Sequence, residues 1–377
     1  MENSPFSPGH AARARRYQMR RLGLGWGAAL ADLAVTAAFL ALFPAGPLPE
    51  ASRFLAGAAF FGLLALAREA ASLPLDYLAG FRLPHLAGLS NETLKGWWAD
   101  RAKGLALLLL LGAPVAGGFL EITSARPAGW WWIAGGLGAG LGVVLALIGP
   151  VLLAPLFFRF RPLSAPELAG RLEDLVRRTG ARVRGGIWEM DLSRKTKGAN
   201  AALVGWGPSR RVVLSDTLLA EYGPEEIEAV LAHEIAHHRG RHIPQLMLGR
   251  ALSLMAGLFL AERLLQGPWG AGALPGAGAL PGPDAPGFIA AVWIFLTLWG
   301  AALSPLLLAY ARRLERFCDD FAVRHTGGGG GLASALTKLC EKNLTDPEPP
   351  RWAVILAHSH PAPIERIRRA RQAEEKC

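Results

Sequence analysis

The 377-residue chain is 51% hydrophobic and 19% charged, and its mean hydropathy of +0.27 is too high for an ordinary soluble globule. Its formal net charge of +10 could suit a nucleic-acid-binding protein. The basic residues, however, flank apolar runs and lack the aromatic motifs that stack on bases, so we expect no nucleic-acid partner. Three scattered cysteines exclude a disulfide framework and a Cys-ligated zinc site.

Six apolar runs have about the 20 residues needed to cross the hydrocarbon core of a bilayer. All six are expected to be helices, at residues 24–43, 54–77, 104–121, 130–157, 245–265 and 287–310. Asp32 lies in the first run, where a charge is costly, so it should face other helices as a buried pair or as part of a pathway. The chain is therefore predicted to be a mainly α, multi-pass membrane protein.

The distribution of Arg and Lys predicts the orientation of these helices. Basic residues occur in the N-terminal tail, the loop 78–103, the block 158–244 and the C-terminal block 311–377. The alternate loops have only two basic residues, Arg53 and Arg126; these loops are 44–53, 122–129 and 266–286. Both termini and both polar blocks are thus expected in the cytoplasm. A composition rich in Ala, Gly, Leu and Arg suggests a bacterial source, and hence the inner membrane.

The stretch His233-Glu234-Ile235-Ala236-His237 lies in a segment whose apolar residues recur with helical spacing. Because residues four apart project from one helix face, His233 and His237 can bind one zinc ion, and Glu234 can activate a water. A chance match to a short pattern is the alternative. Catalytic zinc also needs a third protein ligand and an open position for water.

The third ligand is expected downstream of this helix. A third His six residues after His237 is excluded, since position 243 is Ile and the nearest His is His242. Glu315 and Asp319, four apart in a polar segment after the sixth run, share a helix face. We assign Glu315 as the third ligand and Asp319 as a carboxylate that orients a ligating imidazole. The alternative is a solvated helix face with ion pairs.

Four stretches resemble the integral-membrane zinc metalloprotease family of the type I CAAX prenyl protease, which has HtpX-like relatives. They are residues 89–98, residues 148–157, the pair Asn200-Ala201 with residues 210–219, and residues 360–367. The first two favour the prenyl-protease branch. The resemblance implies a cytoplasmic α+β, gluzincin-type zinc protease domain with a small sheet.

The resemblance also implies roles for four further residues. The Asn200-Ala201 backbone would pair with an extended substrate at a strand edge, a mode of binding that depends little on side chains. His360 would contact the oxyanion or the substrate, and Arg366 would anchor a carboxylate or the framework of the site. The other histidines are expected to be structural or solvent-exposed: His85, His238, His242, His325 and His358.

These expectations combine into one organisation and one activity. Residues 1–157 form a membrane domain of four spans, 158–244 and 311–377 form the catalytic domain, and 245–310 hold the last two spans. The chain should be a metalloendopeptidase with one Zn²⁺, cleaving membrane-associated peptide or protein substrates that are prenylated or membrane-anchored. An HtpX-like quality-control protease is one alternative, and an inactive membrane scaffold or metal-binding protein is another.

One feature departs from the resemblance. Members of the prenyl-protease branch generally have seven membrane helices, whereas six are predicted here, with the deficit ahead of residues 89–98. The resemblance implies a hydrated chamber within the membrane. The missing helix bears on the geometry of that chamber.

Overall fold

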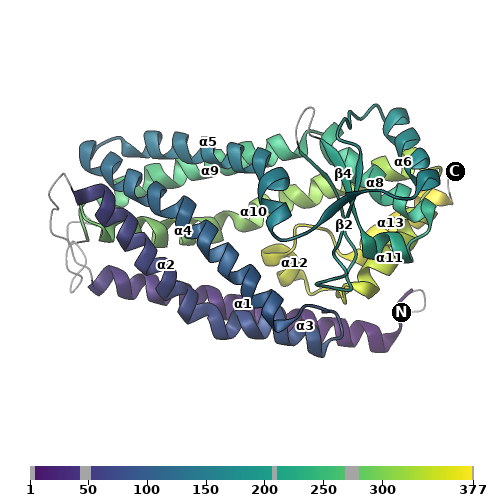
Figure 1. Ribbon diagram of the computed structural model, residues 1–377, viewed down its shortest axis with the longest axis horizontal. Helices are drawn as coiled ribbons and strands as arrows, with labels where there is room; N and C mark the ends of the chain where they lie inside the picture. The colour runs from purple at the N-terminus through teal and green to yellow at the C-terminus, as the bar shows by residue number, and fades with distance from the viewer. Residues whose placement is uncertain (1–4, 43–51, 206–209, 268–279, 376–377) are drawn as a thin grey trace.

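The computed structural model describes residues 5–42, 52–205, 210–267 and 280–375. Long helices form one half of an elongated molecule, and the sheet with the shorter helices forms the other (Figure 1). Six helices in the described ranges are long and apolar enough to span a membrane, which confirms the six predicted spans. They are α1 (Pro8–Leu42), α2 (Arg53–Tyr77), α4 (Leu94–Ala125), α5 (Trp130–Ile148), α9 (His242–Leu265) and α10 (Gly287–His325). Most of the loops 44–53 and 266–286 lies outside the described residues.

Several of these helices continue beyond their apolar runs. Helix α1 begins at Pro8, well before residue 24, and α10 runs on from the membrane region to His325. Charged residues end an apolar run but not a helix, because Arg, Glu and Ala are good helix formers. The extension of α10 matters most, since it carries Glu315 and Asp319 into the half that holds the sheet.

Two other spans end in irregular turns. Helix α2 passes through a π-helical turn, η2 (Leu78–Arg82), into α3 (Leu83–Leu86). Helix α5 passes into η3 (Gly149–Leu153) and η4 (Ala154–Leu156). Each proline removes a backbone donor from the helical ladder, so the prolines in η3 and η4 explain the irregularity after α5.

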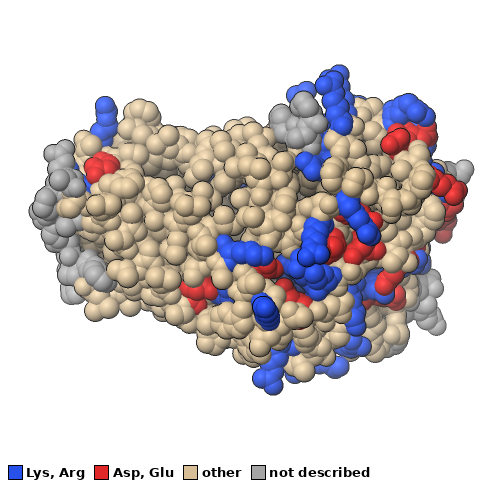
Figure 2. Space-filling model, viewed as in Figure 1, with Lys and Arg blue, Asp and Glu red and all other residues tan. Residues whose placement is uncertain are grey.

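The surface of the long helices is apolar and open. Large side chains point outward along them, including Leu110, which is 69% exposed, and Leu306, which is 68% exposed. Charged side chains gather over the other half of the molecule, and the face of the long helices in view is almost free of them (Figure 2). This surface suits contact with lipid tails. The chain is therefore a multi-pass membrane protein.

Several charges in the first three membrane helices are paired with one another. Nε and Nη2 of Arg68 contact the two carboxylate oxygens of Asp32, so the acid in the first apolar run is half-buried and paired. Arg101 of α4 bridges Glu69 and Asp76 of α2, with 2.6 Å from its Nη2 to Oδ2 of Asp76. These pairs tie α1, α2 and α4 together.

The second half is built on a four-stranded mixed sheet. Its strands are β1 (Phe160–Pro162), β2 (Ile187–Met190), β3 (Ala201–Val204) and β4 (Arg211–Ser215), in the order β1-β2-β4-β3. Strand β3 pairs antiparallel with β4 and has no other neighbour in the described chain, so it is an edge strand.

Short helices surround the sheet and complete one hydrophobic core with it. They are α6 (Pro166–Arg178), α7 (Asp216–Glu221), α8 (Pro224–Arg239), α11 (Gly330–Lys342), α12 (Arg351–Ala357) and α13 (Pro363–Glu374). The core includes Leu214 of β4, Leu231 of α8 and Cys318 of α10, all fully buried. The mainly helical fold with a small sheet agrees with the predicted architecture.

Backbone hydrogen bonds join the two halves next to the edge strand. The amide of Asn91 donates to the carbonyl of Lys195 (3.0 Å), and the amide of Lys197 donates to the carbonyl of Leu89 (2.9 Å). Ser90 and Thr196 form an isolated β-bridge between these bonds. The segment that precedes α4 thus holds the segment that leads into β3.

Candidate active site and metal centre

Helix α8 carries the His-Glu-x-x-His motif, and its sequence explains why it begins where it does. Pro224 occupies its first turn, where a missing amide hydrogen costs nothing, and the Glu226 side chain accepts a hydrogen bond from the amide of Gly223 (2.7 Å). Apolar residues bury one face of α8 in the core. His233 and His237 project from α8 toward α10 and are buried and half-buried, respectively.

The two imidazoles meet one carboxylate from α10. Nε2 of His233 lies 3.2 Å from Oε2 of Glu315, and Nε2 of His237 lies 3.3 Å from Oε1 of the same residue. Glu315 is buried, at 6% exposed. The three residues assigned as ligands from the sequence are therefore brought together from two helices that are far apart in the chain.

This arrangement fits a metal ion. In a tetrahedral site with bonds of about 2.0–2.1 Å, neighbouring ligand atoms lie about 3.3 Å apart, close to both distances observed here. Oε2 of Glu315 is also buried without a hydrogen-bond donor among the described residues. A buried carboxylate oxygen without a donor is costly unless a cation satisfies it.

Cys318 lies close to the same point. Its Sγ lies within 4.8 Å of a nitrogen of both His233 and His237. It also lies 3.5 Å from Nδ1 of His242, whose Nδ1 is 3.2 Å from Nδ1 of His237. His242 is buried, which leaves a structural role and excludes solvent exposure. The short link Gly240-Arg241, with Arg241 at φ 53°, starts a new helix at His242 and brings its ring against His237.

Asp319 and Arg366 form a rigid pair behind His233. Nε and Nη2 of Arg366 donate to the two carboxylate oxygens of Asp319, at 2.9 and 2.7 Å. Oδ1 of Asp319 lies 3.0 Å from Nδ1 of His233. Burial by itself would lower the pKa of Arg366, but its hydrogen bonds to Asp319 outweigh burial and raise the pKa. Of the two roles considered for Arg366, this geometry matches the framework of the site.

Glu234 and His360 face the space in front of the three candidate ligands. Both line a cleft of about 530 Å³, together with Asn200, Ala201 and Arg366. Burial raises the pKa of the Glu234 carboxyl above its ordinary value. His360 comes from the segment before α13, its side chain is 56% exposed, and its Nε2 lies 3.3 Å from Oε1 of Glu315. A proton acceptor and a hydrogen-bond donor thus flank the same cleft.

The edge strand β3 and the residue before it line this cleft. Of the predicted Asn200-Ala201 pair, only Ala201 has a free backbone. The amide of Asn200 donates to Oγ of Ser215 (2.9 Å), and its carbonyl accepts from the amide of Ser215 (2.9 Å). Hydrogen bonding alternates along an antiparallel pair, so the amide and carbonyl of Ala201 face the open edge. The carbonyl of Leu203 is engaged by Nε2 of His238 (2.8 Å). The backbone of Ala201 is therefore available at the open edge, and the Asn200 side chain is exposed beside it.

Two family profiles match consecutive parts of the chain. The profile described as "Peptidase family M48" matches residues 162–374, which contain every residue of the site described above. The chain belongs to peptidase family M48. The profile described as "CAAX prenyl protease N-terminal, five membrane helices" matches residues 5–159. In that range the described residues form four candidate spans, one fewer than the profile's description.

Known proteins are similar over half of the chain or more. An "Uncharacterized metalloprotease YhfN" of Bacillus subtilis is 24% identical over 335 residues, covering 85% of this chain and 75% of that protein. "CAAX prenyl protease 1" of Saccharomyces cerevisiae is 33% identical over 190 residues, which are 50% of this chain and 42% of the yeast protein.

One solved structure, of S. mikatae Ste24p, superposes with a TM-score of 0.82 at 24% identity and covers 96% of this chain and 89% of that one. This likeness extends to the fold of both halves. The family places the chain among membrane metalloproteases, which confirms the resemblance predicted from the sequence and implies that a metal ion belongs to the site.

Proposed function

We propose that the metal is zinc, held by His233, His237 and Glu315, and that the chain is a metalloendopeptidase for membrane-associated, prenylated CAAX-type substrates. The observation that carries the proposal is the convergence of two imidazoles on a buried carboxylate whose Oε2 lacks a donor. Cys318 is not included in the ligand set. The oxygens of Glu315 lie from the imidazole nitrogens at the distances expected between neighbouring zinc ligands, whereas the thiol of Cys318 contacts His242.

A zinc ion in this position supplies Lewis-acid chemistry, polarising the peptide carbonyl and making water more acidic. Glu234 accepts the proton of the attacking water and transfers it to the departing amine; its raised pKa suits both steps. His360 donates to the oxyanion that develops at the carbonyl. Arg366 fixes Asp319, which in turn orients the His233 ring through Nδ1.

The strand edge supports a peptide substrate. An extended chain added to β3 would hydrogen-bond to Ala201 and cross the cleft between Glu234 and His360. The position of this cleft at the end of six membrane helices favours substrates that are themselves held in the bilayer.

The prenylated class is favoured over HtpX-like quality control by the N-terminal profile, which is that of the CAAX prenyl protease. We place the protein in a bacterial inner membrane with its catalytic half and both termini in the cytoplasm, on the basis of the Arg and Lys distribution.

Cleavage of two substrates by the purified protein, each with and without a chelator, tests this proposal. We expect chelator-sensitive cleavage of a prenylated CAAX peptide and little cleavage of casein. Cleavage of casein alone would replace this proposal with quality control, and cleavage of neither would contradict a peptidase role. Elemental analysis of the same sample should give one zinc per chain.

A further inference from the structure

A second pocket, distinct in its chemistry, adjoins the cleft. It has a volume of about 440 Å³ and lies between the first part of α1, the residues around α3 and the segments 195–198 and 342–345. Three residues line both spaces: Gln18, Asn343 and Thr345. The pocket is therefore a continuation of the substrate cleft, which we call the side pocket.

The side pocket lies along the direction in which a bound substrate would run. Antiparallel pairing is the more stable arrangement of strands, and a chain paired antiparallel to β3 runs from Val204 toward Ala201. Its carboxyl-terminal part then continues past Asn200 toward Gly198 and Thr196, both of which line the side pocket. At about 3.3 Å per residue, this part would reach the pocket within about two to four residues.

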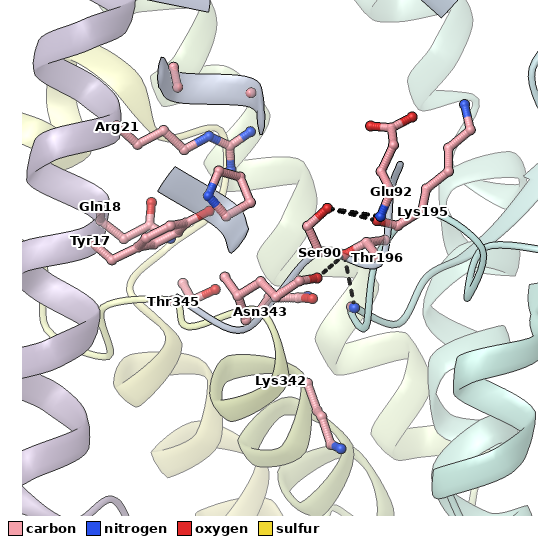
Figure 3. Close-up of a pocket in the computed structure, with 15 residues that line it drawn as sticks. Tyr17, Gln18, Arg21, Ser90, Glu92, Lys195, Thr196, Lys342, Asn343 and Thr345 are labelled. Carbon is pink, nitrogen blue, oxygen red and sulfur yellow. Dashed lines mark hydrogen bonds between the residues drawn. The ribbon is translucent and has the colours of Figure 1, made fainter. Parts of the chain in front are cut away.

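Among the described residues that line the side pocket, one basic side chain is free of a carboxylate and can bind an anion. Lys195 is paired with Asp100, and Lys342 is paired with Glu221. Arg21 is exposed, is hydrogen-bonded to the Tyr17 side chain and has no carboxylate partner among the residues that the structure describes. In Figure 3, Arg21 extends from α1 toward the interior of the pocket, whereas Lys342 points away from the other labelled residues.

Neutral hydrogen-bonding groups surround Arg21. Gln18 lies one turn before it on α1, and Asn343 and Thr345 come from the end of α11 (Figure 3). The one acid that lines the described pocket is Glu92, and burial raises the pKa of its carboxyl. A guanidinium with amides and hydroxyls around it is the group of donors that proteins use for carboxylates.

We propose that the side pocket binds the free α-carboxylate at the carboxyl terminus of the substrate, with Arg21 as its charged anchor. The enzyme would then favour a free carboxyl terminus a few residues beyond the scissile bond over the same sequence with a blocked end. This inference rests on the proposed function for the cleavage itself, but it assigns a separate site and a separate specificity.

The full-length protein in lipid nanodiscs allows a direct test. One peptide is compared in three forms: with a free carboxyl terminus, with a carboxamide, and with a carboxamide following a terminal Asp. We expect kcat/KM to be about tenfold higher or more for the free acid, mainly through KM, because a charge-assisted hydrogen bond is lost with the amide. The third form distinguishes an α-carboxylate from a side-chain carboxylate, and equal cleavage of all three would overturn the proposal.

Variants of α1 assign the effect to its residue. Arg21→Gln should remove the preference for the free acid and leave cleavage of the carboxamide near the wild-type level, and Arg21→Lys should restore part of it. Arg20→Gln is the matched control, because Arg20 is exposed on the same helix and lines neither space. A preference that survives Arg21→Gln contradicts the assignment.

Binding separates this proposal from the proposed function. In a Glu234→Gln background, the dissociation constants of the acid and carboxamide peptides can be compared without turnover. Tighter binding of the acid that depends on Arg21 supports the side pocket even if no cleavage of prenylated peptides is found. Equal binding of the two peptides refutes the side pocket even if cleavage occurs.

Discussion

Two clusters of charged residues in this molecule differ in how their carboxylates are satisfied. In the membrane half, Asp32 has both oxygens on Arg68, and Arg101 serves Glu69 and Asp76. In the site, Asp319 takes both hydrogen bonds of Arg366, and Oε2 of Glu315 has no donor among the described residues. Charges that satisfy each other hold helices together, whereas a carboxylate left without a donor marks the position of a cation.

The variant Glu234→Gln has the largest expected effect, because it removes the proposed general base and keeps the three proposed metal ligands. Glu234→Gln should lower kcat for peptide cleavage by about 100- to 10,000-fold, because the amide cannot accept the proton of water. Zinc content, measured by elemental analysis, should equal that of the wild type. Full activity in this variant would show that another group is the general base.

Removal of the unsatisfied carboxylate tests the comparison directly. Glu315→Ala should lose stoichiometric zinc, because two imidazoles alone bind the ion weakly. Elemental analysis after dialysis against a mild chelator measures the loss.

Two neighbours on α10 serve as controls for that variant. Asp320→Asn removes a carboxylate that is paired with Arg369 at the surface, and Cys318→Ser removes the nearby thiol. Both should keep their zinc. Loss of zinc from Cys318→Ser, with retention in Glu315→Ala, would exchange the two residues as the third ligand.

Removal of a paired charge in the membrane half should lower the stability of the protein without changing its zinc content. Asp32→Asn leaves the half-buried Arg68 without its carboxylate and should cost about 2 kcal/mol of stability, because hydrogen bonds to a charged group are lost. Thermal unfolding in detergent measures this, and zinc content should not change. The double variant Asp32→Asn/Arg68→Gln should recover part of the loss; no recovery would indicate a role for Asp32 beyond the pair.

The smallest effect concerns a satisfied carboxylate in the catalytic half. Burial alone would raise the pKa of Glu226, but hydrogen bonds from Lys338, Ser334 and the amide of Gly223 outweigh it and lower the pKa. Because the folded pKa is depressed, this stabilisation is complete above the unfolded pKa and is lost as the pH falls through the folded value.

The variant Glu226→Gln tests this pH dependence of stability. It should be less stable than the wild type by about 1 kcal/mol near neutral pH, and the difference should close as the pH falls below about 4. Unfolding midpoints recorded across this range test the expectation. A difference in stability that stays constant with pH would mean that ionised Glu226 stabilises the fold no more than its neutral form does.

Local patterns were sufficient to predict much of this fold. Apolar runs predicted all six spans within a few residues at most of their ends, because lipid contact imposes composition on each helix separately. The start of α1 at Pro8 was missed, since the arginines before residue 24 leave the apolar run but remain helical. Helical spacing likewise predicted which faces carry His233, His237 and Glu315.

Contacts between distant segments could not be predicted in the same way. The Asp32–Arg68 pair joins two helices, and no spacing rule specifies which charges meet across a bundle. The contact of His242 with His237 depends on the left-handed conformation of Arg241, for which the sequence offers only the preceding glycine as a signal. The engagement of the Asn200 backbone by Ser215 depends on the register of β3 and β4.

The backbone bridge between residues 89–91 and 195–197 has a mechanical consequence. It fastens the segment that leads into β3 to the segment that leads into α4, so the strand edge sits at a constant height above the membrane helices. Under the proposed function, a substrate whose lipid stays in the bilayer would then need a matching number of residues between its lipid and the scissile bond.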